Sequence, residues 1–307
     1  VGVSLQNRFS PEREGPWPSP QAPAPPPARR PVRALLGQLA PQPADLAANA
    51  RRAAEVIRAN AGADLVVLPE LFLCGYDLAT VRDLAVTPDG PELAAVREAA
   101  AAARTAVLVG IAEDRGDAIA NALVAIDVDG DTAGVARKVQ LFGDEAAVLD
   151  AGDELSVVEL GGHRIGAMIC FDMEFPECAR ALALAGADLL VTASANMAPF
   201  HADHLLASRA RALDNRLAHL YVNRVGAEAG LRFVGGSRAI ASDGTVMADA
   251  GQDDERLLEV EVPRDEAGDE RTAYLALLRE DLRAVPARPL AAPASGGHHD
   301  KARERHG

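Results

Sequence analysis

The sequence predicts an α/β protein whose sheets are covered by helices. Along most of the chain, short apolar runs of strand length alternate with stretches whose apolar residues recur at helical spacing. Some of these strands are apolar throughout, which is typical of strands buried on both faces. Neither an internal repeat nor a change of composition divides residues 32–285, so we expect a single domain there.

The first half of this domain supplies strands and two amphipathic helices. The apolar run VRALLGQLA precedes a helix that Gly62 ends. The apolar face of that helix comprises Leu46, Ala50, Ala53 and Ile57. The strand DLVVLP comes next, and the remaining elements are a helix from about Pro91 to Ala103 and strands at 106–112, 119–127 and 132–137.

The second half repeats the alternation. Gly161 and Gly162 form a turn signal between strands at 155–160 and 163–170, and Pro176 opens a helix. The continuous apolar run DLLVTA is typical of a buried strand. In the following helix the predicted buried face comprises Leu206, Ala210, Leu213 and Leu217, and further strands are expected up to about Val262.

The two ends of the chain differ from this domain. Residues 11–31 carry nine of the twenty prolines, so we expect residues 1–31 to be a disordered leader. A solvated tail is favoured there over a proline-rich ligand for a partner domain. Residues 286–307 are rich in Pro, Gly, His and charge, and they are expected to form a disordered tail.

Composition narrows the classes of partner. The 307 residues include 31 basic and 45 acidic side chains, and the resulting net charge of −14 argues against nucleic acid or an anionic membrane as the partner. No uncharged apolar stretch reaches the roughly 18 residues of a membrane span. The N-terminal sequence also lacks the pattern of a secretory signal. We therefore expect a soluble, cytoplasmic protein.

The cysteines and histidines predict no metal site. None of the three cysteines lies in a C-x-x-C pair, so reduced thiols are expected. His201 and His204 lack the spacing and the glutamate of H-E-x-x-H, and no third ligand is evident.

Glu70 is the first candidate for chemistry. It directly follows the strand DLVVLP, which places its carboxylate at a strand end beside a hydrophobic core. Partial burial would raise its pKa, as suits a group that acts first as general base and later as general acid near neutral pH. Taken alone, an ordinary loop glutamate is the alternative interpretation.

Lys138 and Cys170 also stand at strand ends. Lys138 precedes the apolar pair Leu141 and Phe142, and in a pocket its ammonium could stabilise an oxyanion and lower the pKa of a neighbouring thiol. Cys170 closes the run RIGAMIC before the polar turn FDMEFPE, the half-exposed setting that a reactive thiol needs. Taken singly, the lysine could be solvated and the cysteine a small core residue.

Together the three residue types make a complete set for covalent catalysis. They would converge at one edge of the sheets if their strands are neighbours. A base, a cation for the tetrahedral oxyanion and a nucleophile would then lie in one place.

Three segments of the chain resemble a known family. LVVLPELFLCGYD, ARKVQLFGDE and GAMICFDMEFPE are similar to the motif segments of the nitrilase superfamily, the carbon-nitrogen hydrolases. Their order and spacing match over about residues 32–262, and RALALAGADLLVTASA, RARALDNRLAHLYVNRVG and GGSRAIASDGTV resemble the downstream blocks. The resemblance implies an α/β fold of the nitrilase type, an α-β-β-α sandwich.

It also implies an amidase-like hydrolase of carbon-nitrogen bonds other than peptide bonds. Such an enzyme needs neither a metal nor an organic cofactor. A homodimer or higher homo-oligomer is implied as well, although RTAYLALLREDLRA resembles the closing motif near the family's subunit interface only loosely.

The resemblance assigns a role to each candidate. Glu70 would be the general base, Lys138 the oxyanion holder with the backbone N–H of Phe171, and Cys170 the nucleophile. Glu145 matches the family's second glutamate, which positions the lysine and the substrate amide; its alternative interpretation is a surface charge. The implied reaction forms an acyl intermediate on the cysteine, releases ammonia and hydrolyses the thioester to a carboxylic acid.

The residues after the cysteine indicate the substrate class. Cys170-Phe171-Asp172 resembles amidases and carbamoylases, whereas true nitrilases tend to have a small residue or tryptophan followed by glutamate. CFDMEFPE with SANMAPF is similar to amidases of short aliphatic amides, including omega-amino amides. An N-carbamoyl amine or amino acid is the alternative substrate, and a nitrile is less favoured.

Loops supply the expected walls of the substrate pocket. The residues expected in these walls are Tyr76, Asn196, Met197 and Phe200, and packing is their alternative role. The candidate acidic partners for a cationic amine are Asp77, Asp172 and Glu174.

A nitrilase-like scaffold without catalytic activity is a further alternative. Such a module would be marked by loss of a triad residue. Glu70, Lys138 and Cys170 are all present, so we favour the enzyme.

Overall fold

The computed structural model describes residues 31–263 and 274–279. The predicted tail at 286–307 and all but the last residue of the predicted leader at 1–31 lie outside these residues. Within the described part of the chain, no helix combines the length and the apolar character needed to cross a bilayer.

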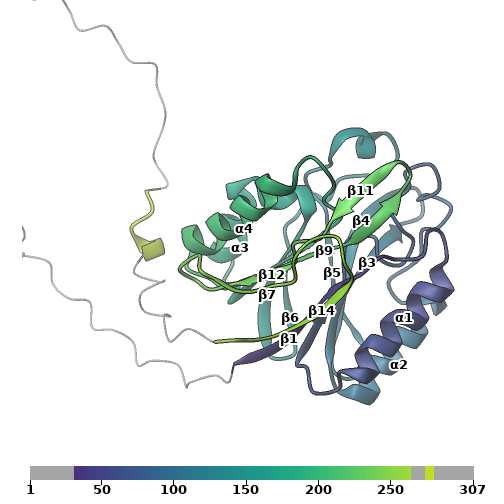
Figure 1. The fold of residues 1–307 in the computed structure, drawn as a ribbon, viewed down its shortest axis with the longest axis horizontal. Coiled ribbons are helices and arrows are strands. Elements are labelled where there is room, and N and C mark those ends of the chain that lie inside the picture. Colours follow the sequence, from purple (N-terminus) through teal and green to yellow (C-terminus); the bar gives the residue numbers. More distant parts are fainter. Residues whose placement is uncertain (1–30, 264–273, 280–307) are drawn as a thin grey trace, which may run out of the picture.

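Two six-stranded sheets form the centre of the fold (Figure 1). In the order of the first sheet, its strands are β14 (Arg256–Val262), β1 (Val32–Gln38), β2 (Leu65–Val67), β3 (Ala106–Asp114), β4 (Ile119–Ile126) and β5 (Thr132–Arg137). The strands of the second sheet, also in order, are β13 (Val246–Asp249), β12 (Arg238–Ile240), β9 (His219–Asn223), β8 (Leu189–Ser194), β7 (His163–Ile169) and β6 (Val157–Leu160). A separate antiparallel pair comprises β10 (Val225–Glu228) and β11 (Leu231–Val234).

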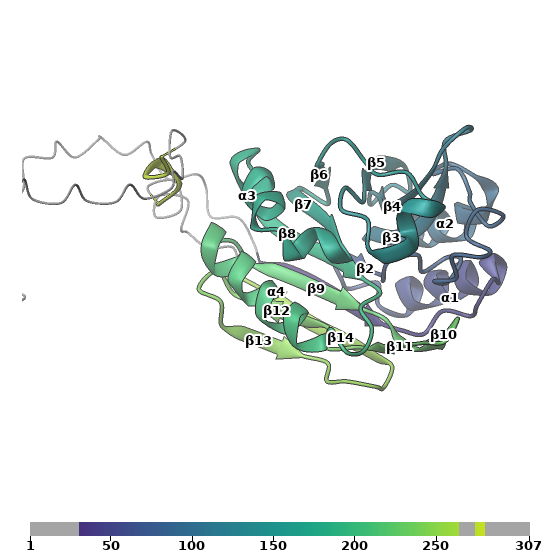
Figure 2. The same cartoon turned by 90° about the horizontal axis from the view of Figure 1, so that it is seen from above.

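Two pairs of helices cover the outer faces of the sheets. The pair α1 (Leu46–Ala59) and α2 (Ala94–Ala103) lies on one side of the molecule, and α3 (Pro176–Leu184) and α4 (His201–Asn215) lie on the other (Figures 1 and 2). Short 3-10 helices are η1 (Pro91–Leu93), η2 (Gly143–Ala147) and η3 (Cys170–Glu174). This is the predicted α-β-β-α sandwich, and the fold class is confirmed.

The apolar pattern of α1 follows the prediction. The Asp45 carboxylate accepts a hydrogen bond from the N–H of Ala48 at 2.8 Å and caps the helix. Ala50, Ala53 and Ile57 are buried against the first sheet, and burial of a side chain the size of Ile57 contributes about 1.5–3 kcal/mol.

The predicted buried face of α4 is confirmed only in part: Leu217, just past the end of the helix, is buried and Ala210 is half-buried. Leu206 and Leu213 are 70% and 42% exposed, whereas His204, Ser208 and Arg211 are buried. These polar side chains can be buried because they are hydrogen-bonded; Arg211, for example, donates from Nε to the carbonyl of Met173 at 2.9 Å.

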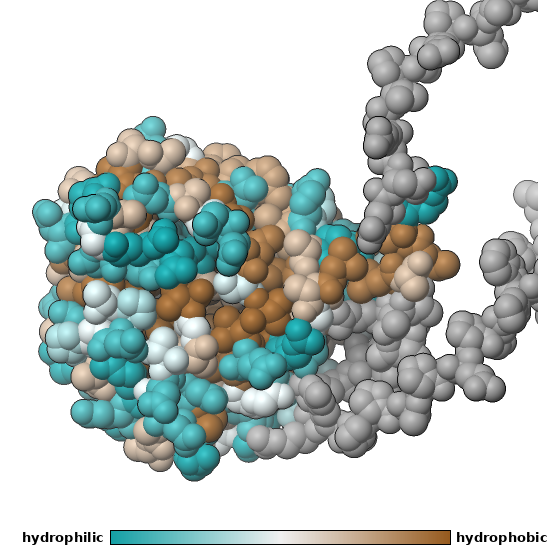
Figure 3. Space-filling view, turned by 180° about the vertical axis from the view of Figure 1, so that it is seen from behind, coloured by the Kyte–Doolittle hydropathy of each residue, from teal (hydrophilic) through white to brown (hydrophobic). Residues whose placement is uncertain are grey.

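Apolar residues fill the space between the two sheets. Leu36, Val67 and Leu108 of the first sheet pack with Val191 and Leu220 of the second. The face seen from behind in Figure 3 mixes hydrophilic and hydrophobic residues. The tightly packed interior leaves the loops at the strand ends as the place for polar chemistry.

The strand directions determine which ends meet. β1, β2 and β3 are mutually parallel, and β5 runs the same way because two successive antiparallel pairings connect it to β3. The carboxyl ends of β2 and β5 therefore lie at one edge of the first sheet, although β3 and β4 separate them.

Candidate active site

Glu70 follows β2 in a tight turn. The next residue, Leu71, has a left-handed φ of 49°, and the turn lies directly against β3. A Cβ on Gly110 would lie only 2.3 Å from the carbonyl oxygen of Pro69. Glycine at position 110 therefore permits the close approach that places the glutamate.

Three donors hold the fully buried Glu70 carboxylate. Its Oε1 accepts hydrogen bonds from Lys138 Nζ at 2.8 Å and from Asn121 Nδ2 at 2.6 Å. Its Oε2 accepts from the backbone N–H of Ala195 at 2.6 Å, in the loop after β8 of the second sheet. A carboxylate has about four lone-pair sites, so this arrangement leaves one for an incoming proton.

Lys138 lies between two carboxylates. It follows β5, is fully buried, and donates from Nζ to Glu70 Oε1 and to Glu145 Oε1, both at 2.8 Å. Burial alone lowers the pKa of Lys138, but the charges of Glu70, Cys170 and Glu145 outweigh it, so the pKa is raised and the ammonium stays charged. Two of its three N–H donors are used within the described residues, and the third remains for an oxyanion.

Glu145 is fully buried, so its interpretation as a surface charge is wrong. Besides Lys138, its Oε1 accepts a hydrogen bond from the Tyr76 hydroxyl at 2.7 Å. Its Oε2 accepts from the backbone N–H of Phe142 at 2.8 Å, the residue directly before the short helix η2. Glu145 thus connects the lysine to the loop that carries Tyr76.

Cys170 begins η3 at the end of β7 in a strained conformation. Its φ is 47°, a left-handed value that costs a non-glycine residue about 1–2 kcal/mol. The side chain is 9% exposed and packs against Leu123, Ala136 and Ala193, so it is more buried than the half-exposed setting that we expected. A sharp strand-to-helix turn of this kind directs the side chain of a nucleophile out of the strand.

The surroundings of Cys170 keep it protonated. Burial and the charge of Glu70 raise the pKa of the thiol. The Lys138 ammonium lowers this pKa, but by less than the other two effects together raise it. The expected lowering by Lys138 is therefore present but is not the dominant effect. To act as a nucleophile, this thiol would have to give its proton to a nearby base, and Glu70 acts electrostatically on the same sulfur.

The four residues predicted to wall the pocket differ in position. Tyr76 is buried with its hydroxyl on Glu145, and the Asn196 side chain donates to the carbonyl of Phe200 at 3.2 Å. Met197 is 6% exposed and pairs with the backbone of Phe233. Phe200 is 39% exposed.

Phenylalanine rings surround the cysteine turn. The ring of Phe142 contacts those of Phe171 and Phe200 at centroid distances of 5.3 and 5.6 Å, and Phe171 contacts Phe175 at 5.0 Å. Aromatic side chains therefore border the Cys170 turn and offer apolar surface beside it.

The three candidate acidic partners for a cationic amine differ in what their carboxylates contact. The Asp77 carboxylate accepts from the N–H of Ala79 at 2.9 Å in its own turn. Asp172 uses both oxygens on backbone N–H groups. The Glu174 side chain is 31% exposed and holds His204 Nε2 through Oε1 at 3.1 Å.

Asn121 and Ala195 are the contacts that sequence reasoning missed. A polar residue within the apolar strand IANALVAI was the signal for Asn121. No residue type marks the contribution of Ala195, because the backbone makes it.

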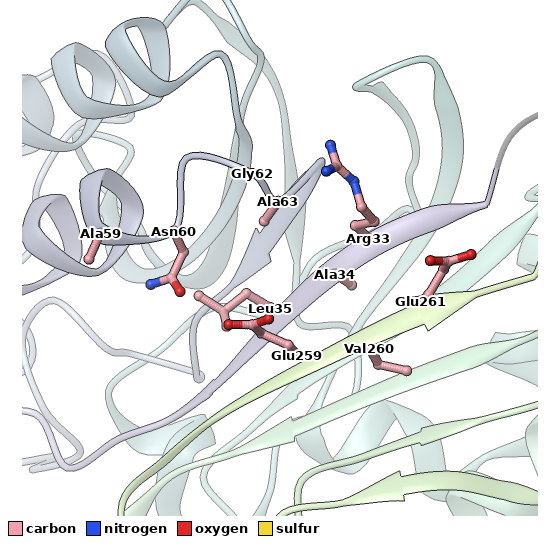
Figure 4. A pocket seen from close by; sticks show the side chains of 10 residues that line it. All are labelled: Arg33, Ala34, Leu35, Ala59, Asn60, Gly62, Ala63, Glu259, Val260 and Glu261. Carbon is pink, nitrogen blue, oxygen red and sulfur yellow. The ribbon is translucent and has the colours of Figure 1, made fainter.

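Two further features of the described residues bear on where ligands could bind. Among the described residues, no group of three or more His, Cys, Asp or Glu side chains could hold a metal ion. A cavity of about 460 Å³ lies between the start of β1, the end of α1 and β14 (Figure 4). It borders the amino end of β1, whereas Glu70, Lys138 and Cys170 follow the carboxyl ends of their strands.

Comparisons with known proteins show the family of this chain. The Carbon-nitrogen hydrolase family profile matches residues 33–272. A protein of Pseudomonas protegens described as "Hydrolase in pqqF 5'region" is 41% identical over 258 residues, which is 82% of this chain and 90% of the relative. An (R)-stereoselective amidase from Pseudomonas sp. is 36% identical over 242 residues, which is 78% of this chain and 88% of the relative.

A solved structure extends the likeness to the fold. A double mutant of the amidase from Nesterenkonia sp. AN1, in complex with acrylamide, has a TM-score of 0.72 at 26% identity. The match covers 81% of this chain and 94% of that one. This chain therefore belongs to the carbon-nitrogen hydrolases of the nitrilase superfamily, hydrolases that act on carbon-nitrogen bonds other than peptide bonds.

Proposed function

We propose that this protein hydrolyses a small aliphatic amide to a carboxylic acid and ammonia through an acyl intermediate on Cys170. The observation that carries the proposal is the buried ammonium of Lys138, held 2.8 Å from the carboxylates of Glu70 and Glu145. A cation fixed in a dry site stabilises an oxyanion without reorganising as the charge develops.

The proposed reaction begins with proton transfer. Glu70 takes the thiol proton through its remaining lone-pair site as the sulfur of Cys170 attacks the amide carbonyl carbon. The third N–H of Lys138 and the backbone N–H of Phe171 bind the tetrahedral oxyanion. Glu70 then gives its proton to the leaving nitrogen, and ammonia departs.

The second half-reaction uses the same groups. Glu70 takes a proton from water, and the hydroxide attacks the thioester carbon while Lys138 again holds the oxyanion. Collapse breaks the carbon-sulfur bond and releases the carboxylic acid, and Glu70 returns its proton to the sulfur of Cys170. The raised pKa of this thiol makes the sulfur the group that is reprotonated.

The surroundings of the cysteine support an amide with a short carbon chain. The rings of Phe142, Phe171 and Phe200 supply apolar surface, and one relative carries the name (R)-stereoselective amidase. Glu174 is the candidate for binding an amino group on an omega-amino amide, because the described residues engage only its Oε1 and its side chain is partly exposed.

A substrate panel tests the proposal. Ammonia release is measured with short aliphatic amides, omega-amino amides, N-carbamoyl compounds and nitriles. We expect the amides to be turned over fastest. Faster turnover of N-carbamoyl compounds or nitriles would show that one of those classes, and not an amide, is the substrate.

Cysteine variants test the nucleophile. Cys170→Ala should abolish turnover, and Cys178→Ala is the matched control because Cys178 is a buried thiol packed in α3 against Met168 and Leu182. Undiminished turnover by Cys170→Ala would refute the proposed mechanism.

A further inference from the structure

The carboxylate of Asp172 makes three backbone hydrogen bonds beside the site. Its Oδ2 accepts from the N–H of Ile169 at 3.0 Å. Its Oδ1 accepts from the N–H of Val139 at 3.1 Å and from that of Gln140 at 2.7 Å. Asp172 is 1% exposed, so these bonds replace its contact with water.

These bonds join the two segments that carry the reacting groups. Val139 and Gln140 directly follow Lys138 at the end of β5 in the first sheet. Ile169 ends β7 in the second sheet and directly precedes Cys170. One side chain therefore ties the segment of the ammonium to the turn of the thiol across the interface between the sheets.

The bond to Ile169 also supports a strained backbone. Cys170 has a φ of 47°, which persists only where surrounding interactions hold it. The Asp172 carboxylate closes the turn around this residue from two positions further along the chain. Without that acceptor, the turn can relax and move the sulfur.

Only the ionised carboxylate can make all of these contacts without a conflict. An ionised carboxylate has acceptors alone, whereas a protonated carboxyl or an amide presents a donor on one side. A donor at the Oδ2 position would face the N–H of Ile169, and a donor at the Oδ1 position would face those of Val139 and Gln140. Replacing Asp172 by asparagine keeps the shape of the side chain but removes the hydrogen bonds to one of the two segments.

Charged and titratable groups surround Asp172 on several sides. Lys138 faces it from the end of β5 and Cys178 from α3, and Arg211 of α4 binds the carbonyls of Met173 and Glu174 in the same turn. Burial raises the pKa of Asp172 to about 6, although the three backbone N–H groups and Lys138 lower it in part. The group is thus ionised at neutral pH and loses its charge in mild acid.

We propose that Asp172 is a positioning residue that holds Lys138 and Cys170 in register across the two sheets. The sulfur of Cys170 attacks the carbonyl carbon of the amide, and the ammonium of Lys138 then lies beside the oxyanion that forms on that carbonyl. This role rests on the proposed function, because it concerns the same oxyanion. Asp172 does not touch the substrate, and it acts through the backbone on either side of the two reacting residues.

The test compares Asp172→Asn with a matched control, Asp127→Asn. Asp127 also accepts a backbone N–H across the two sheets, from Gly161 at 3.0 Å, but at the opposite end of the strands. We expect Asp172→Asn to lower kcat by about 10²-fold, the effect of a misplacement of about 1 Å, with KM within about twofold of wild type. Asp127→Asn should retain the wild-type kcat.

The pH profile separates positioning from a general loss of structure. In the wild type and in Asp127→Asn, kcat should rise as the pH passes about 6, the pKa of Asp172. The residual kcat of Asp172→Asn should lack that step. Wild-type kcat in Asp172→Asn, or an unchanged acid step in it, would overturn the proposal. If Asp172→Asn does not fold, the wild type alone tests the proposal: a wild-type kcat that does not rise as the pH passes about 6 would overturn it.

Alkylation of Cys170 by iodoacetamide, located by peptide mass, gives a readout that needs no turnover. At neutral pH we expect it to be at least about tenfold slower in Asp172→Asn than in Asp127→Asn, because the sulfur and its charged neighbours are displaced. Equal rates would overturn the positioning role. Absence of ammonia from every wild-type assay would instead refute the proposed function. The alkylation rates of the two variants would then still test whether Asp172 positions Cys170.

Discussion

The ammonium of Lys138 lies 2.8 Å from the carboxylate of Glu70, although 68 residues separate them along the chain. Both follow strands of the first sheet, and neither is accessible to water. Because the desolvation of buried charges is expensive, such a pair is weak evidence for a purely stabilising role and is better explained by function.

Removal of the lysine charge should damage both activity and stability. Lys138→Met leaves Glu70 and Glu145 facing each other without a cation, so we expect kcat to fall by at least about 10²-fold and the free energy of unfolding by about 3–5 kcal/mol. Denaturant unfolding and ammonia release measure the two effects. Arg104→Met is the control, because its pair with Asp129 is exposed and contributes at most about 1 kcal/mol. Equal losses in both variants would contradict the role of the buried cation.

The hydroxyl of Tyr76 should matter through Glu145. Burial and the charges of Glu70 and Glu145 raise the pKa of Tyr76, so the hydroxyl remains a donor at neutral pH. Tyr76→Phe removes that donor from a buried carboxylate and should reduce the free energy of unfolding by about 1.5–3 kcal/mol, with a smaller loss of kcat than Lys138→Met.

Tyr274→Phe is the matched control for the hydroxyl. Tyr274 is 41% exposed and its ring lies 5.1 Å from the Arg216 guanidinium, a contact that phenylalanine keeps. Unchanged stability and turnover in Tyr76→Phe would show that Glu145 does not depend on this hydroxyl.

A methyl group at position 110 should displace Glu70, the proposed general base. In Gly110→Ala the new Cβ would lie 2.3 Å from the carbonyl oxygen of Pro69 and 2.5 Å from the nitrogen of Leu71, so the turn of Glu70 must shift. We expect a loss of about 1–3 kcal/mol in the free energy of unfolding and a lower kcat. Gly62→Ala, whose new Cβ has its nearest neighbour at 3.8 Å, should change neither. Full activity in Gly110→Ala would contradict the close approach.

Acid should destabilise the protein through His219. The ring is fully buried between the Thr192 hydroxyl and the Ser208 carbonyl, and burial lowers its pKa from 6.5 to about 4. Below pH 6.5 His219 is protonated in the unfolded state but stays neutral in the folded state. Its contribution to the free energy of unfolding therefore falls as the pH drops to about 4, by about 3 kcal/mol in total.

Denaturant unfolding of the wild type and of His219→Gln across this range measures the effect. The stability difference between the two proteins should shrink as the pH falls from 6.5 to 4. A constant difference would show that His219 does not titrate in this way.

The sequence allowed most of the strands and all four larger helices to be predicted, because apolar residues recur at regular spacing and Pro176 marks the start of α3. The buried face of α4 could not be predicted in the same way. Its leucines Leu206 and Leu213 are exposed, and hydrogen bonds compensate for the burial of His204, Ser208 and Arg211. Periodicity registers apolar side chains but not the partners that make polar burial possible.

The same limit applies to the site. Glu70, Lys138 and Cys170 could be selected because each ends a strand, and a resemblance added Glu145. The bonds of Glu70 to Ala195 and of Asp172 to Val139 run to backbone N–H groups of distant segments. Such contacts depend on how the two sheets face each other, and no residue type encodes them.

Detection of the acyl intermediate tests the central claim most directly. The wild type is mixed with the amide that it turns over fastest and quenched in acid within the first turnover, and the adduct is located by peptide mass. The account predicts an added acyl group on the peptide of Cys170 and none on those of Cys74 or Cys178. Turnover without an adduct on Cys170, or with the acyl group on another residue, would contradict it.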